Sequence, residues 1–147
     1  PVISKPLVPP VAAFDYRVGK VYVLHVSHPK GSFLIVGSAS WQPDHLQGLR
    51  ADVVFLGVGG LGSQTADYRE VYWRETLAMV SPVRVIPIHY DSLTGPIEGA
   101  FRGQVNIAAA ISGGEQATRS FLQQKAMAQP AIRFQTLPRY DQVVLFQ

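Results

Sequence analysis

The sequence predicts an α/β domain with a mixed sheet that contains a β-α-β unit. Residues 53–56 are an uninterrupted apolar run, and residues 83–89 form a second, largely apolar run, so both are expected to be strands buried on two faces. Between them, residues 67–80 place apolar side chains at helical spacing. A strand, a helix and a strand in this order normally pair the two strands in parallel.

The residues before this unit predict an extended arm followed by a β-hairpin. Four of the first ten residues are proline, so residues 1–14 are expected to form an extended arm and residues 15–147 a single αβ domain. Residues 20–27 and 33–36 are β-rich runs that flank the turn sequence Pro-Lys-Gly-Ser. These two runs are expected to pair as a hairpin.

The residues after the unit predict a second flanking helix and two short strands. Residues 91–114 contain several glycines and have no clear period, whereas residues 115–128 predict a helix that Pro130 ends. Residues 132–137 and 143–146, separated by a turn, predict two short strands or a hairpin.

Composition excludes several classes of function. The 13 basic and 10 acidic residues give a net charge of +3, and the basic residues are scattered, so no concentrated face for nucleic acid is expected. The chain has no cysteine, which excludes disulfides, zinc ribbons and thiol nucleophiles and leaves histidine and carboxylate as metal ligands. The longest uncharged stretches are too rich in glycine and polar residues to span a membrane. We expect a soluble protein, cytoplasmic or exported with its signal removed.

The side chains of the predicted helix have ordinary structural explanations. Tyr68, Tyr72 and Trp73 recur at helical spacing, as core residues do. Glu70 and Arg74 are oppositely charged and four residues apart, which predicts an ion pair on a solvated face, and Glu75 extends the same alternation of charge.

A glycine-rich loop begins at Gly57 and ends at Gly62, and it satisfies the dinucleotide-binding pattern G-x-G-x-x-G after a predicted strand. The fit to that pattern is partial. The acid that ends the next strand, Asp91, lies beyond the roughly 20-residue offset of a ribose-binding acid. Residues 63–66 also separate the glycines from the predicted helix, which the pattern would open directly. Both a nucleotide site and a plain loop remain open, and the spacing favours the loop.

A histidine ends the second buried strand and is followed two residues later by an acid: His89 and Asp91. Polar groups at the carboxyl ends of parallel strands commonly face the ligand crevice of an α/β sheet. His89 is therefore a candidate metal ligand or acid–base group, although a single histidine at a strand end is more often structural.

The order of these motifs resembles the C-terminal half of metallo-β-lactamase-fold hydrolases. The matching pieces are G-K-V-Y at 19–22, F-L-I-V-G-S at 33–38, A-D-V-V-F-L-G at 51–57 and V-I-P-I-H-Y-D at 85–91. The last strands expected, near 134–137 and 143–146, fit the end of that fold. The resemblance implies half of a four-layer αβ/βα sandwich, with a metal site between two half-sheets.

The resemblance implies one metal ligand in this chain, His89. The family's main signature, H-x-H-x-D-H, belongs to the first half of the fold and does not occur here. Three other histidines are poor candidates. His25 and His28 lie three residues apart on a predicted strand and so point to opposite faces, and His45 follows a turn sequence in a predicted loop.

A second departure from the family lies after the strand at 33–36, where Gly37-Ser38 stands in place of the usual Gly-Asp. A hydroxyl is a poor substitute for a carboxylate that bridges two metals. Some relatives have Gly-Ser-Ala at this point, as at 37–39 here. By resemblance, Ser38 and Asp91 are assigned as catalytic residues that line the site, with Ser38 holding a water or a substrate oxygen.

We therefore expect the C-terminal portion of a metal-dependent hydrolase of a small-molecule ester, amide or phosphoester, using Zn²⁺ or another divalent metal. One histidine and one carboxylate do not hold Zn²⁺ well, so the chain alone is expected to be inactive. The start at Pro1, without an initiator methionine, suggests a trimmed N-terminus. An uncovered sheet face would need the missing N-terminal half or a second copy. The alternatives are a nucleotide-binding module that uses the glycine loop and a non-catalytic, dimerising half-fold.

Overall fold

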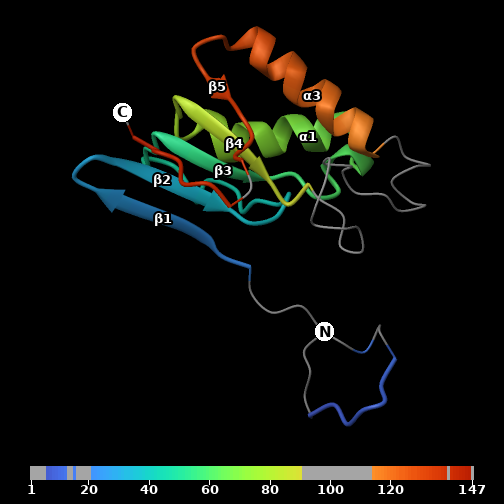
Figure 1. Cartoon of the computed structure of the whole chain (residues 1–147). Coiled ribbons are helices and arrows are strands. Elements are labelled where there is room, and N and C mark those ends of the chain that lie inside the picture. The colour runs from blue at the N-terminus through green and yellow to red at the C-terminus, as the bar shows by residue number, and fades with distance from the viewer. Residues whose placement is uncertain (1–5, 13–14, 16–20, 91–113, 139, 147) are drawn as a thin grey trace.

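A computed structural model of the chain describes residues 6–12, 15, 21–90, 114–138 and 140–146, which form a five-stranded sheet (Figure 1). The strands are β1 (Val23–His28), β2 (Gly31–Val36), β3 (Val53–Gly57), β4 (Arg84–Ile88) and β5 (Arg133–Phe134). Their order across the sheet is their order in the chain. β1 pairs antiparallel with β2, and the three following pairings are parallel. The predicted α/β class with a mixed sheet is confirmed.

The first two strands form the predicted hairpin. Pro29 and Lys30 make its turn, and the ring Nδ1 of His28 accepts a hydrogen bond of 3.1 Å from the backbone N–H of Lys30. Gly31 and Ser32, expected in the turn, are the first residues of β2. Proline is favoured here because its fixed φ suits a turn and it removes no donor from the ladder.

The β-α-β unit is also confirmed. Its helix α1 (Ala66–Trp73) continues in a π-helical turn, Arg74–Ala78, and leads into β4, which is parallel to β3. The helix begins where the hydroxyl of Thr65 accepts a hydrogen bond of 3.2 Å from the N–H of Tyr68. It ends before Ser81, whose φ of +50° reverses the chain.

The second predicted helix is α3 (Gly114–Ala128), and it lies on the same side of the sheet as α1 (Figure 1). Trp73 of α1 is 4% exposed and fills the space between this helix and the sheet. Its ring packs edge-on against Phe121 of α3 at 6.1 Å and stacks with Phe134 of β5 at 5.9 Å. The main core lies between the sheet and these helices and includes Leu34, Val36, Val54, Leu56, Leu61, Tyr72, Leu77, Val80 and Val85.

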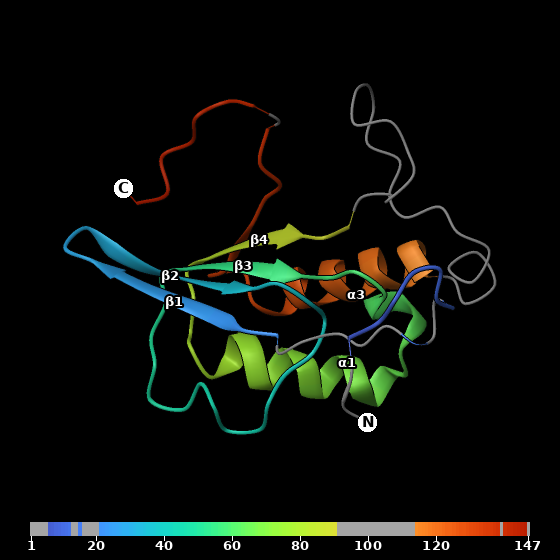
Figure 2. The same cartoon turned by 90° about the horizontal axis from the view of Figure 1, so that it is seen from below.

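The opposite face of the sheet is apolar as well. Side chains alternate along a strand, and paired residues share a face. The apolar members of this face are Leu24, Val26, Phe33, Ile35, Val53, Phe55, Ile86 and Ile88, and Arg84 lies on the same face at the start of β4. Figure 2 views the sheet from this side, where neither α1 nor α3 lies. Leu24 and Val26 of β1 remain 54% and 40% exposed, so this apolar face is only partly covered.

The C-terminal residues depart from the predicted strands. β5 has only two residues and pairs with β4, and residues 143–146 form no strand, so the expected second strand or hairpin is wrong. The cause is a side chain that takes the place of a partner strand. The Arg84 guanidinium donates to the carbonyl oxygens of Val144 and Leu145, at 3.0 and 3.3 Å, and Phe146 stacks on Phe33.

Some expectations fall outside what the structure describes. Asp91 and nearly all of the irregular region lie within 91–113, and half of the arm, residues 1–5 and 13–14, also lies outside the described residues. Residues 6–12 of the arm are described and have no helix or strand. Neither α1 nor α3, in the part of the chain described, combines the length and apolar character that a membrane-spanning helix needs.

The packing of the core predicts that alanine substitutions at two leucines on paired strands differ in their effect on stability. Leu34 is fully buried, so Leu34→Ala should lower the free energy of unfolding by about 2–5 kcal/mol through lost burial and a residual cavity. Leu24→Ala removes the same atoms from a side chain that is 54% exposed and should cost under about 1 kcal/mol. Urea denaturation followed by circular dichroism measures both values, and equal losses would contradict this packing.

Candidate functional site

The carboxyl ends of β2, β3 and β4 meet at one edge of the sheet, because these strands are adjacent and parallel. The register places Ser38, Val58 and His89 at the same level, each two residues beyond a paired position. A hydrogen bond of 3.0 Å from the N–H of Val58 to the carbonyl of Ile88 extends the ladder toward this level. Two of the predicted site residues, Ser38 and His89, therefore lie at the same edge.

His89 stands exposed just beyond β4 and has a left-handed backbone, with φ of +56°. This conformation is uncommon for residues other than glycine and occurs often at functional positions. Gly59 explains how the imidazole is accommodated. A Cβ at Gly59 would lie 2.8 Å from the His89 carbonyl oxygen and 2.9 Å from its Nδ1, so the glycine leaves room for this histidine.

Ser38 is half-buried, and its hydroxyl lies 2.9 Å from the hydroxyl of Ser40. β3 separates the ends of β2 and β4, so two inter-strand spacings, about 10 Å in all, lie between Ser38 and His89. That separation is too long for a serine–histidine hydrogen bond. Ser38 is therefore suited to holding a water or a ligand oxygen rather than to acting as an activated nucleophile.

Two tyrosines of α1 tie this edge of the sheet to the helix. The buried hydroxyl of Tyr72 donates to the carbonyl oxygen of Gly57 at 2.6 Å and lies 3.3 Å from that of Ser38. The hydroxyl of Tyr68 donates to the carbonyl of Ala39 at 2.8 Å. Burial raises the pKa of Tyr72 far above its usual value, so the phenol remains a donor. Sequence reasoning treated both as core residues, and their spacing of four residues was the only signal of a shared role.

Trp41 completes this support by packing edge-on against the ring of Tyr68, with centroids 4.6 Å apart. The same indole lies 6.3 Å from the ring of Tyr72. The aromatic contacts hold the segment after Ser38 against α1.

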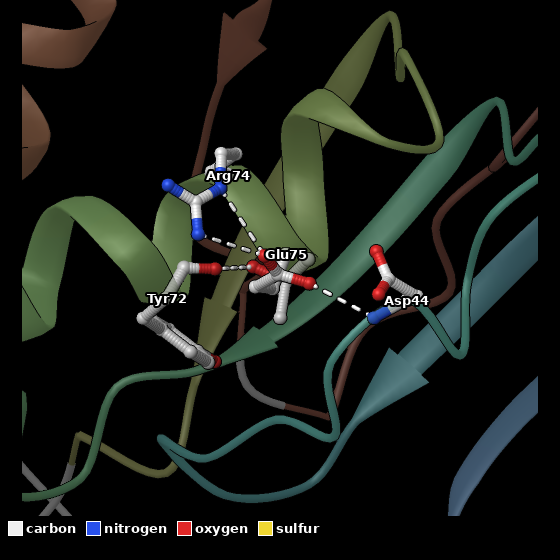
Figure 3. Close-up of polar contacts among 5 residues, drawn as sticks. Asp44, Tyr72, Arg74 and Glu75 are labelled. Carbon is white, nitrogen blue, oxygen red and sulfur yellow. Dashed lines mark hydrogen bonds and ion pairs between the residues drawn. The ribbon is translucent and has the colours of Figure 1, made fainter.

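Glu75 anchors the loop that follows Trp41 (Figure 3). This carboxylate is 6% exposed; it accepts hydrogen bonds from the backbone N–H of Asp44 at 3.1 Å and from the Arg74 guanidinium at 3.0 and 3.1 Å. The pKa of Glu75 is lowered, chiefly by the hydrogen bond from the Asp44 backbone and next by the hydrogen bonds from Arg74. The solvated position expected for Glu75 is thus wrong, because its side chain is buried. The expected Glu70–Arg74 pair is also wrong, because Glu70 pairs with Lys125 of α3 at 2.5 Å.

A metal site requires more ligands than this edge supplies. Within the described residues, no three side chains of histidine, aspartate or glutamate come together, and the predicted residue Asp91 lies outside them. His25 of β1 donates to the carbonyl of Arg50, and His45 is exposed in its loop. Zinc needs three or four protein ligands, so the described residues do not by themselves fit the metal.

The glycine loop has a packing explanation. Gly60 has φ of +72° and precedes a 3₁₀ turn, Leu61–Ser63, and α1 begins only at Ala66. A Cβ at Gly62 would collide with the backbone of Gly114 at the start of α3. The loop therefore does not open a helix directly, and Gly62 is needed for close approach of α3. The nucleotide site stays a prediction from the pattern alone.

No known protein family, curated protein or solved structure matches this chain significantly. The chemistry of the site therefore has to be argued from the residues just described.

The hydrogen bonds of the Tyr72 hydroxyl predict that their removal lowers stability and alters the segment after β2. Tyr72→Phe removes the donor to Gly57 and Ser38 and leaves a buried carbonyl without it, so the free energy of unfolding should fall by about 1–3 kcal/mol. Tyr140→Phe, at a residue 86% exposed, should change it by less than about 0.5 kcal/mol. Urea denaturation measures the loss. Amide NMR shifts of Ser38 and Ala39 unaltered by Tyr72→Phe would contradict the anchoring role.

Glu75 predicts a specific acid sensitivity. Its pKa in the folded chain is below the ordinary value of 4.5, so its stabilising contribution is present above that pH and is lost as the pH falls through the folded pKa. Glu75→Gln should lower stability at pH 7 and flatten the decline of stability below about pH 4.5. Thermal melts between pH 3 and 7 test this, and parallel pH profiles for the two proteins would refute it.

Proposed function

We propose that this chain is the C-terminal portion of a metal-dependent hydrolase of the metallo-β-lactamase superfamily, and that it supplies one metal ligand and one wall of the site. The observation that carries the proposal is the position of His89. This histidine is exposed, stands at the carboxyl end of a parallel strand in a left-handed conformation, and is level with Ser38. Ligands of open α/β sheets bind at this end of the strands.

The second face of the sheet supports the proposed four-layer sandwich. Apart from Arg84 at the start of β4, its side chains along β1 to β4 are mainly apolar; the face carries neither α1 nor α3, and Leu24 and Val26 remain 54% and 40% exposed. A second half-sheet packed on this face would bury these side chains and would stand beside His89. The complementary half of the fold is thus the partner we propose for this surface.

The roles of the chain's own residues follow from their positions. The exposed imidazole of His89 can coordinate a divalent cation such as Zn²⁺ through a ring nitrogen, and the Ser38 hydroxyl can hydrogen-bond to an oxygen of the substrate or of water. Asp91 remains a proposed catalytic residue from its place in the sequence. When fully ligated, such a metal polarises a small-molecule ester, amide or phosphoester and activates water. Because the other ligands are not among the described residues, activity requires the complementary half.

A non-catalytic half-fold that dimerises is a second candidate, which the same apolar face favours. In that case two copies would cover each other's sheets, and His89 would have no metal role. Light scattering of the purified chain separates the two: a stable dimer without zinc supports the second candidate, and a monomer that gains zinc only with its complement supports the first.

The proposed metal role of His89 predicts that zinc affinity falls when this histidine, but not another, is replaced. The chain is produced together with the segment encoded upstream of it, and zinc affinity is measured by competition with a chromophoric chelator. His89→Ala should weaken zinc binding at least tenfold, because it removes a direct ligand. His45→Ala, which removes an exposed loop histidine, should bind zinc as the unaltered protein does. Zinc affinity that survives His89→Ala, or an upstream segment without H-x-H-x-D-H, would overturn the assignment.

A further inference from the structure

A second candidate site lies at the other end of the sheet. A cavity of about 610 Å³ opens where the parallel strands begin, between the hairpin turn and the C-terminal residues. Its lining includes Lys30, Asp52, Arg84 and Arg133. The strands are five or six residues long, so this cavity is about 15 Å or more from the level of His89 and is independent of the proposed hydrolase site.

One of the lining residues is a buried arginine. Arg84 is 4% exposed, and its Nη1 donates to the carbonyls of Val144 and Leu145. Its Nε is buried and has no hydrogen-bond partner. No carboxylate among the described residues forms an ion pair with it. A guanidinium is always charged, and burying it without a counter-charge is unfavourable, so an anion bound beside it would stabilise this arginine.

The other charged residues of the lining also favour an anionic ligand. Lys30 and Arg133, both exposed, add two positive charges to that of Arg84 on the cavity wall. Asp52 is the one acidic residue among the lining residues, and its Oδ2 already accepts hydrogen bonds from the backbone N–H and the hydroxyl of Ser32, at 2.6 and 3.0 Å. The lining therefore carries three cations and one carboxylate, and that carboxylate is hydrogen-bonded to Ser32 of the same lining.

We propose that this cavity binds a phosphate group, as inorganic phosphate or as a phosphomonoester. Arginine is suited to oxyanions because its planar fork of donors matches two phosphate oxygens, and lysine adds a mobile charge at the rim. The volume leaves room for the organic part of an ester beside the phosphate. A bound phosphate would give Arg84 a counter-charge, which the neutral carbonyl groups of Val144 and Leu145 do not supply.

Chemical-shift titration tests the proposal. The ¹⁵N-labelled 147-residue chain is titrated with inorganic phosphate and with glycerol 3-phosphate, each against sodium chloride at equal ionic strength. Saturable shifts of the Lys30, Gly31 and Arg84 amides are expected with both phosphates and not with chloride. Arg84→Met should weaken binding at least tenfold, and Arg119→Gln, which removes a charge from the exposed side of α3, should leave it unchanged.

Because Arg84 is buried, its replacement can also unfold the chain, so an exposed pair provides an independent test. The double variant Lys30→Gln/Arg133→Gln should keep the fold and weaken phosphate binding at least fivefold. No saturable shift in the unaltered chain overturns the proposal. So does phosphate affinity that persists in both this double variant and a folded Arg84→Met protein.

Discussion

The organisation of this protein depends on the need to cover both faces of β3. This strand lies between two parallel neighbours, and its side chains are apolar on each side. Val54 and Leu56 are buried beneath the helices, whereas Val53 and Phe55 belong to the opposite face. Parallel sheets are stable when both faces are covered. The helices satisfy this requirement on one face, and part of the C-terminal segment, with Phe146 on Phe33, satisfies it partly on the other.

Core packing and site geometry are connected through Tyr72. Its ring belongs to the buried core, so its hydroxyl must find an acceptor inside the protein. The acceptors are the backbone carbonyls at the ends of β2 and β3, Ser38 and Gly57. The position of Ser38 at this edge of the sheet is therefore tied to that of α1. Glu75 acts in the same way one turn later, because its carboxylate binds the loop after Trp41 to the helix.

The two edges of the sheet differ in chemistry. The carboxyl edge combines an exposed histidine, a serine and glycines, of which Gly59 packs closely against His89. The amino edge instead gathers basic side chains around Arg84, which occupies a position in the same row as Phe33 and Val53. A buried arginine beside Phe33 and Val53 is costly unless its donors are used, and its Nη1 donates to two carbonyls of the C-terminal segment.

The sequence by itself determined the hairpin, the β-α-β unit and α3, because apolar period and turn residues act within a few positions of the chain. It also indicated His89, which follows directly on a strand that could be predicted, whereas Ser38, two residues beyond β2, was indicated by the family resemblance. Tertiary structure decided the rest. Glu70 pairs with Lys125, Glu75 is buried against Asp44, and residues 143–146 bind Arg84 instead of pairing as a strand. These outcomes depend on partners up to 61 positions apart, and local pattern carries no information about which distant group will be nearest.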